Sequence, residues 1–524
     1  MNRESTPYTP QVNKWLIAIA VMPGTFMELI DTTVVNVALP HIAGSLSAGV
    51  DESTWVLTSY LVSNAIMMPL AAWLAGTVGR KRLLMVCLVV FTISSMACGA
   101  APTLGSLIFF RVVQGAGGGA LQPLSQAILF ESFAVEERGM AMAVYGVGAI
   151  VAPIVGPLLG GWITDNLNWR WAFYINFPVG ILALITTTMF IFDPDYLRAR
   201  KSGRMDFLGV GLLVVGIGAL QIVLDKGERD DWFSSAFIVR LSVVALVALV
   251  ALVYWELKTR KPFVDLRLFK DRNFASGVTV FFFFRFVLYG SMVLLPLFLQ
   301  TLMGYNATLA GEIMAWGGVS AMIMMPMTGR LCNQVDNRWL SIFGLLIGAW
   351  ATYLMSLFNI EIGYATALWP RLLQGLGIGV TFVALTNLTM GHISREKMGN
   401  ATGIYNLLRN LGGSFGIAVT TTLLARRAQF HQSRLVEHVI PGSLPFSAWQ
   451  HRIAEILPGL GPHWNYWEAP RAMATLYTQV QVQAMTLSFG DGYWFFTVLF
   501  LLLVPLVFMM RQREMPPEEI TKGG

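Results

Sequence analysis

The chain has 524 residues, of which 55% are hydrophobic and only 13% are charged, and its mean hydropathy is +0.60. This composition excludes an ordinary soluble domain. It predicts a polytopic membrane protein, because apolar stretches of about 20 residues, the length that crosses ~30 Å of hydrocarbon, recur along nearly the whole sequence. The net charge of +6 reports membrane topology and gives no support for nucleic-acid binding.

Fourteen apolar stretches are predicted to be membrane-spanning helices. The first is not a cleaved signal peptide, because it is too long, carries Glu28 and Asp31 and lacks a small-residue cleavage site. The approximate bounds in chain order are 15–37, 54–75, 83–101, 105–128, 139–163, 171–192, 207–225, 236–255, 274–299, 309–329, 339–358, 364–390, 400–425 and 490–510.

Basic residues orient these helices, since Lys and Arg are retained on the cytoplasmic side of short loops. If both termini are cytoplasmic, most Lys and Arg fall in inward loops and tails, including Arg80, Lys81 and the stretches 198–204 and 258–272. We therefore expect both termini in the cytoplasm and the chain in a bacterial cytoplasmic (inner) membrane.

The cysteines and histidines indicate neither a disulfide framework nor a metal site. Cys87, Cys98 and Cys332 are odd in number and lie in or at the ends of spans, which favours a packing role. Four of the six histidines fall within the outward segment 426–489 without metal-ligand spacing. We expect no metal and no cofactor, and an enzyme is disfavoured because no nucleophile–base set is present.

An internal repeat relates the two halves of the chain. The run RVVQGAG at residues 111–117 returns as RLLQGLG at residues 371–377. The displacement of 260 residues (371 − 111) recurs for two further pairs, Gly139 with Gly399 and Tyr145 with Tyr405. Two parallel membrane-helix repeats are typical of a rocker-switch transporter with a substrate path between its halves.

The displacement also predicts the domain organisation. Six spans with short loops need roughly 180 to 190 residues at about 20 per crossing, so additional chain must separate the repeats. Two extra spans supply it. We therefore predict six-helix bundles at 1–192 and 274–524, joined by two linking helices within 193–273, with both bundles in an all-α fold of fourteen transmembrane helices.

Charged residues inside the spans are the candidate functional groups, because intramembrane charge is costly unless it is paired or hydrated. Asp31 and Glu28 lie three residues apart on one helix face, and Arg111 and Arg285 also lie within spans. Asp31 is favoured as a proton-exchanging acid over a purely structural partner of Arg111. Glu28 is either a second proton site, a counter-ion for a cationic substrate or a partner of Arg285, and Arg285 could equally hold an anionic substrate.

Four segments carry a family resemblance. Residues 29–40 (LIDTTVVNVALP) resemble the first-helix signature of fourteen-span drug:proton antiporters of the major facilitator superfamily, the EmrB/QacA-like branch. Residues 107–120 resemble the fourth-helix Arg motif, 156–161 (GPLLGG) the antiporter motif of helix five, and 169–178 (WRWAFYINFP) the turn into helix six. The resemblance covers nearly the whole chain and implies the major facilitator fold.

The resemblance implies proton-coupled export of hydrophobic or amphipathic drugs across the lipid bilayer, driven by protons and contributing to antibiotic resistance. Proton coupling is expected at Asp31 and Arg111, which lie within the matched motifs, and at Glu28 as a second intramembrane acid. Candidate substrate-binding and conformational residues are Glu28, Asn36, Gln114 and Arg285 for binding, and Arg80, Lys81, Gly156, Pro157, Gly160 and Gly161 for the conformational motifs.

Two departures from the family pattern stand out. Gly76 occupies the position where the superfamily usually has Asp, so a charge lock between inner helix ends is expected to be missing. In helix five, Ala152 replaces one of the usual glycines upstream of Gly156, which weakens the expectation of close packing there while leaving the Gly-Pro pair.

The outward segment 426–489 has helical pieces at 428–439 and 471–487 and a Trp-rich patch at 463–467. Its length resembles that of pumps which pass substrate to a periplasmic adaptor protein and an outer-membrane channel. Adaptor contact is therefore favoured over an occluding lid or an inert connector.

Other functions stay open. A dedicated exporter of one metabolite, such as a siderophore or a fatty acid, would share every residue named above. An importer is disfavoured by the Gly-Pro motif of helix five, and a membrane scaffold or receptor would not need a buried acid and arginine.

Overall fold

The structure is a computed structural model that describes residues 12–134, 137–193, 206–259, 262–440, 444–456 and 470–511. The described part is helical and contains no strand. In order, the first helices are α1 (Lys14–Ser45), α2 (Val50–Ser53), α3 (Trp55–Val78), α4 (Arg80–Ala100), α5 (Leu104–Gly118), α6 (Leu121–Ser132), α7 (Arg138–Asn166), α8 (Trp171–Tyr174) and α9 (Asn176–Phe190).

The remaining helices follow in two groups. The linking group is α11 (Phe207–Lys226), η2 (Trp232–Ser234), α12 (Ala236–Lys258) and η3 (Leu266–Lys270). The last group is α13 (Arg272–Thr301), α14 (Ala307–Leu331), α15 (Asn337–Ser356), α16 (Tyr364–Met390), η4 (Arg395–Lys397), α17 (Met398–Glu437), α18 (Leu444–Ile456) and α19 (Pro470–Phe508). We call α1 to α9 the first repeat and α13 to α19 the second repeat.

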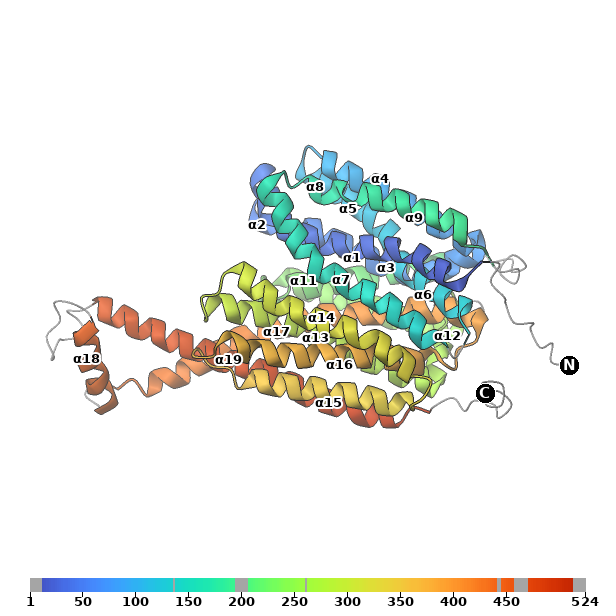
Figure 1. Ribbon diagram of the computed structural model, residues 1–524. Helices are drawn as coiled ribbons and strands as arrows, with labels where there is room; N and C mark the ends of the chain where they lie inside the picture. Colours follow the sequence, from blue (N-terminus) through green and yellow to red (C-terminus); the bar gives the residue numbers. More distant parts are fainter. Residues whose placement is uncertain are drawn as a thin grey trace.

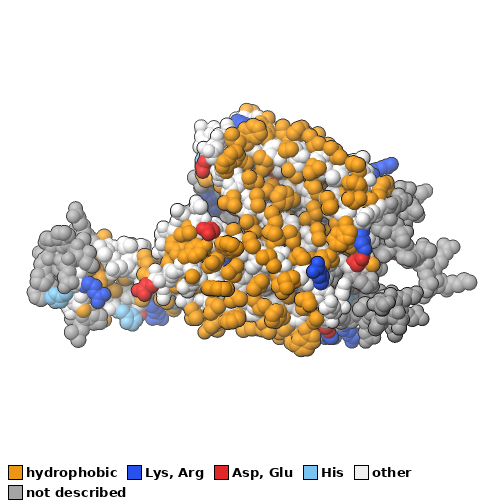
Figure 2. All heavy atoms as spheres, in the orientation of Figure 1, with side chains coloured by type: hydrophobic (Ala, Val, Ile, Leu, Met, Phe, Trp, Pro, Cys, Tyr) orange, Lys and Arg blue, Asp and Glu red, His pale blue; other side chains and the backbone are white. Residues whose placement is uncertain are grey.

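Every predicted span coincides with a helix or with two consecutive ones. In the described residues, thirteen helices are long and apolar enough to cross a membrane, with α5–α6 and α8–α9 each counted once. The fourteenth predicted span is α17, which is more polar and packs against α13, α19 and α3. Hydrophobic side chains cover the flank of the bundle, as a lipid-facing surface requires (Figure 2). The predicted all-helical fold is confirmed.

Glycines of the duplicated motif build the same local packing twice. A Cβ at Gly115 would lie 2.5 Å from the Tyr60 carbonyl oxygen of α3, and one at Gly375 would lie 1.9 Å from the Gly317 carbonyl oxygen of α14. Only a residue without a side chain permits such close helix approach. The motif therefore fixes α5 against α3, and α16 against α14, in equivalent ways.

The two repeats meet crosswise, with α7 of the first against α14 of the second, and α17 of the second against α3 of the first (Figure 1). A Cβ at Gly139 would lie 2.9 Å from the Gly329 carbonyl oxygen, and one at Gly399 would lie 3.7 Å from the Ala72 side chain. Because Gly139 and Gly399 are themselves repeat equivalents, the contact has a two-fold character.

The linking helix α11 packs against both repeats. It contacts α3, where Asp225 accepts a hydrogen bond from Thr58, and α17, where Gln221 Nε2 donates to Ser414 Oγ at 2.9 Å. α12 lies outside it and packs mainly on α11. The two extra helices thus border the α3–α17 contact and leave the α7–α14 contact uncovered.

The sequence predicted separate helical pieces in the outward segment 426–489. In the structure, its described parts are mainly extensions of two membrane helices. α17 continues without a break to Glu437, and α19 begins at Pro470, so both membrane helices project well beyond the bundle as an arm with α18 at its tip (Figure 1). Asp491 Oδ2 joins them by accepting from Arg427 Nε and pairing with His431 Nε2, each at 2.6 Å. The predicted Trp-rich patch at 463–467 lies outside the described residues.

Candidate functional site

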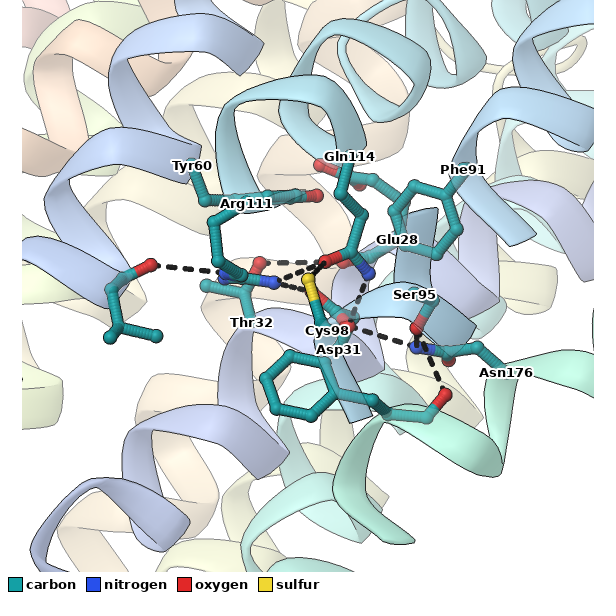
Figure 3. A network of polar contacts seen from close by, with 12 residues as sticks. Glu28, Asp31, Thr32, Tyr60, Phe91, Ser95, Cys98, Arg111, Gln114 and Asn176 are labelled. Atoms are coloured by element: carbon teal, nitrogen blue, oxygen red, sulfur yellow. Dashed lines mark hydrogen bonds and ion pairs between the residues drawn. The ribbon is translucent and has the colours of Figure 1, made fainter. Parts of the chain in front are cut away.

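Asp31 lies at the centre of a buried polar network in the first repeat (Figure 3). Its Oδ2 accepts from Arg111 Nη1 at 2.6 Å, and its Oδ1 accepts from Gln114 Nε2 and from Asn176 Nδ2, each at 2.8 Å. Asp31 and Arg111 are both fully buried. Three helices, α1, α5 and α9, therefore converge on one carboxylate, and removing one member of such a buried pair costs about 3–5 kcal/mol.

Arg111 is held from several sides. Its Nε donates to the Val56 carbonyl oxygen at 3.0 Å, its Nη1 also reaches Gln114 Oε1 at 2.8 Å, and the Tyr60 ring lies 4.1 Å from the guanidinium carbon. Its Nη2 is buried without an acceptor in the described residues. The Arg111 guanidinium is therefore held in one orientation, and its Nη2 remains available as a donor.

The helix-five motif brings α7 close to the helix that carries Asp31. A Cβ at Gly156 would lie 1.8 Å from Thr33 Oγ1, and one at Gly160 would lie 3.1 Å from the Val34 carbonyl oxygen. Gly161 has open space instead. The first two glycines let α7 pack directly on α1, next to the acid, and this packing persists although Ala152 stands upstream.

Glu28 belongs to a second network on the same helix face. Its Oε1 accepts from Asn64 Nδ2 at 3.0 Å and its Oε2 from Gln122 Nε2 at 2.6 Å. Gln122 Oε1 in turn accepts from Arg409 of α17 and from the Tyr145 hydroxyl at 3.4 Å. Gln122 therefore connects the carboxylate of one repeat with a buried arginine of the other.

Arg285 is placed away from Glu28. Its Nη2 donates to the Tyr289 hydroxyl at 3.2 Å, with the Tyr289 ring 4.6 Å from the guanidinium carbon, and its Nε is buried without an acceptor. No carboxylate of the described residues lies within 4 Å of it. The sequence left two partners open for Arg285, which were Glu28 and an anionic substrate. In the structure, Arg285 does not contact Glu28.

Of the other predicted binding residues, one joins the site and one does not. Gln114 joins Asp31, whereas Asn36 is exposed and forms no hydrogen bond with the described residues. Sequence reasoning did not single out Asn176 or Gln122 as site residues. Asn176 lies within the matched motif 169–178, whereas the only signal for Gln122 was a polar amide within an apolar stretch. Arg409 is a further polar group within the predicted span 400–425, and its spacing gives no sign that Gln122 links it to Glu28.

The inner loop between α3 and α4 has a charge lock after all. Arg80 forms a buried ion pair with Glu131 of α6, and the Lys81 backbone N–H donates to Asp193 Oδ1 at 2.8 Å. The expectation of a missing lock was wrong because it rested on Gly76 alone. Glu131 lies far along the sequence from this loop, and the pattern around Gly76 gives no sign of it.

The described residues contain no group of three or more His, Cys, Asp or Glu that could hold a metal ion. The three cysteines are buried and free, and Cys98 lies 3.6 Å from Gln114 Oε1. The chemistry that this arrangement offers is proton exchange and charge pairing between side chains of different membrane helices.

Comparison with known proteins agrees with this geometry. Residues 21–417 match the Major Facilitator Superfamily. The chain is 37% identical over 513 residues to the multidrug export protein EmrB of Escherichia coli and 36% identical over 512 residues to the fatty acid resistance protein FarB of Neisseria gonorrhoeae, covering 97% of each chain in both cases.

The structure resembles that of the human organic anion transporter MFSD10 with a TM-score of 0.62 at 15% identity, covering 95% of this chain and 100% of that one. At that identity the likeness supports the fold alone. The sequence matches show that this multi-pass membrane protein belongs to the major facilitator superfamily, in the branch that contains the EmrB multidrug export proteins.

Proposed function

We propose that the protein is a proton-coupled antiporter that exports hydrophobic or amphipathic drugs by alternating access. The observation that carries the proposal is the fully buried Asp31–Arg111 pair, tied by Gln114 and Asn176 to three helices of the first repeat. An intramembrane acid is a functional candidate by default. The identity to EmrB over nearly the whole chain supports multidrug export as the activity.

In the proposed cycle, Asp31 takes up a proton when the protein faces outward, and substrate leaves. Protonation removes the charge that holds Arg111 and so weakens the α1–α5 link. When the protein faces inward, Asp31 releases the proton and substrate binds, so each ligand selects one member of the conformational pair. A membrane potential adds about 2.3 kcal/mol per charge for every 100 mV, which would drive a useful gradient.

The test is transport in proteoliposomes that hold the purified full chain. A pH gradient is imposed, and both the movement of a fluorescent amphipathic drug and the pH of the lumen are followed. We expect drug and protons to move in opposite directions with a fixed ratio. Drug movement that does not respond to the gradient, or protons and drug moving together, would contradict antiport.

A second candidate is a dedicated exporter of one acidic metabolite such as a fatty acid or a siderophore. It is favoured by two arginines near the contact between the repeats, the half-buried Arg285 and the buried Arg409, each of which has a buried Nε without an acceptor in the described residues. The name of the relative FarB points the same way. Competition by a panel of anionic, neutral and cationic compounds separates the two: a narrow, acid-only profile indicates the dedicated exporter.

We further propose the division into bundles 1–192 and 274–524 with linking helices within 193–273, and a bacterial cytoplasmic membrane location. The arm formed by α17, α18 and α19 is proposed to contact a periplasmic adaptor protein and, through it, an outer-membrane channel. Exposed apolar side chains on the arm, such as Phe430, Val436 and Tyr477, support a protein contact there.

Deleting residues 445–470, a stretch that includes most of α18, tests this partner. We expect drug resistance of cells to fall while transport in proteoliposomes is retained. Loss of both would indicate a lid or a folding role, and retention of both would indicate an inert connector.

A further inference from the structure

The repeat places a buried arginine in the second repeat that lacks the counter-charge of its equivalent. Displacement by 260 residues carries Arg111 to Arg371, Gln114 to Gln374 and Asp31 to Ser291. The second repeat therefore has the cation and the amide of the network, with a neutral hydroxyl in place of the carboxylate.

The hydrogen bonds of the two networks otherwise match. Arg371 Nη1 donates to Gln374 Oε1 at 2.5 Å, and Gln374 Nε2 donates to Ser291 Oγ at 2.9 Å. In the first repeat the corresponding distances are 2.8 Å from Arg111 to Gln114 and 2.8 Å from Gln114 to Asp31. The second network therefore has the same order of hydrogen bonds as the first, but it lacks the negative charge of Asp31.

Arg371 is only 3% exposed, and no carboxylate of the described residues lies within 4 Å of it. Its Nε is buried without an acceptor in the described residues, and the buried hydroxyl of Tyr493 on α19 lies near both the guanidinium and Ser291. A Cβ at Gly317 would lie 2.5 Å from Nε, so this glycine makes room for the side chain. Donors and positive charge converge with a shortage of acceptors.

An unpaired intramembrane cation costs several kcal/mol, and a buried donor without an acceptor adds to that cost. Asp31 and the Tyr60 ring stabilise the charge of Arg111, whereas no aromatic ring of the described residues is stacked on Arg371. A species that only accepts hydrogen bonds and carries one negative charge would satisfy the group. Arg371 lies seven residues after Tyr364, the outer start of α16, hence about 10 Å along the helix at 1.5 Å per residue.

We propose that Arg371, with Tyr493 and the Ser291–Gln374 pair, forms a binding site for a small monovalent anion, chloride, that enters from the outer side of the membrane. The anion takes the place that Asp31 fills in the first repeat. The site stands apart from the Asp31 network and does not depend on whether the protein exports drugs.

The test uses the purified full chain in lipid nanodiscs without substrate, at constant ionic strength. Sodium chloride replaces sodium gluconate stepwise, and the midpoint of thermal unfolding is followed by tryptophan fluorescence. Because a ligand that binds only the folded state stabilises it by mass action, we expect the midpoint to rise with chloride and to saturate. Equal midpoints in chloride and gluconate would overturn the proposal.

Variants locate the effect. Ser291→Asp supplies an internal carboxylate, so the chloride response should disappear, whereas Ser291→Asn, of similar size and uncharged, should keep it. Arg371→Gln should lose the response, and Arg285→Gln should retain it. A response that survives in Ser291→Asp or in Arg371→Gln, or that is lost only in Arg285→Gln, would place the anion elsewhere and overturn the assignment.

Discussion

Arg111 and Arg371 occupy the same position of the repeated motif, yet their surroundings differ. Arg111 is bonded to a carboxylate, an amide and a backbone carbonyl, while Arg371 reaches only an amide. The glycines that set the helix packing are present in both repeats. The two repeats therefore share the packing of their helices but differ in their charged residues. Glu28 and Asp31, the acids of the two buried networks, both belong to the first repeat.

The division extends to the contact between the repeats. The first repeat offers Glu28 and Asp31, and the second offers Arg285, Arg371 and Arg409 without a carboxylate within 4 Å in the described residues. Of these, only Arg409 is linked, within the described residues, to an acid of the first repeat, through Gln122, which hydrogen-bonds both Arg409 and Glu28. If the protein exchanges protons as proposed, protonation of Glu28 would change this link between the repeats directly.

Among equivalent substitutions in the two repeats, Asp31→Asn is expected to have the largest effect on transport. It removes the exchangeable proton and leaves Arg111 without its counter-ion, at a cost of about 3–5 kcal/mol, so we expect proton-driven drug efflux in proteoliposomes to fall to background while the protein stays inserted. The repeat-matched control, Ser291→Asn, should retain efflux. Full proton-driven efflux by Asp31→Asn would remove this residue from the mechanism.

Replacing the arginines sharpens the comparison. Arg111→Gln should shift the pH dependence of transport or abolish coupling, because Asp31 loses its ion-pair partner. Arg371→Gln, measured at fixed chloride, should leave the shape of the pH profile unchanged since no acid lies beside it. The measurement is the initial rate of efflux between pH 5.5 and 8.5, spanning neutrality. Identical profiles for both variants and the unchanged protein would make Arg111 structural.

A smaller effect is expected from Arg285→Gln, which tests whether the second repeat sets charge preference. Affinity for an acidic lipophilic compound should fall about tenfold, equivalent to about 1.4 kcal/mol, with little change for a cationic one. The double variant Glu28→Gln with Arg285→Gln should give no rescue, since the two side chains do not pair. A uniform loss for all compounds that the double variant restores would refute the idea.

Much of this arrangement could be predicted from the sequence. The spans follow from hydropathy, the repeat from its constant displacement, and the Asp31–Arg111 pair from two charges that would each be costly alone. Glu28 and Arg285 illustrate the limit, because whether they pair depends on the rotation of α13. Arg285 instead bonds the hydroxyl of Tyr289, one turn further along the same helix, which is a local i,i+4 contact.

The parts that could not be predicted share a physical cause. Amides such as Gln122 and Asn176 look like ordinary helix-packing residues until their partners are known. The continuation of α17 into the arm was hidden because residues beyond 425 become polar, which ends a hydropathy signal without ending a helix. Glu131 pairs with Arg80 across 51 positions of sequence, a separation at which no local pattern operates.

The smallest expected effect concerns the inner ends of the repeats and the variant Gly76→Asp. Gly76 lines a cavity of about 40 Å³ together with Arg80 of the first repeat and Gly399 of the second, and a Cβ at Gly76 would meet nothing within 4 Å. A carboxylate there would face the N-terminus of α17, where the helix dipole favours negative charge by about 0.3–1 kcal/mol. Arg80 already pairs with Glu131, and Glu396 also lines the cavity, so the gain should stay in the lower part of that range.

We expect Gly76→Asp to hold the inner ends together and to slow drug efflux about twofold, since tenfold corresponds to about 1.4 kcal/mol. Gly76→Asn, which adds similar volume without charge, is the matched control and should slow efflux less. Labelling of a cysteine placed at Asn400 reports opening of the inner end and should become slower in Gly76→Asp alone. If both variants behave alike, bulk rather than charge acts at this position, and the inner contact between the repeats does not depend on the carboxylate that Gly76 replaces.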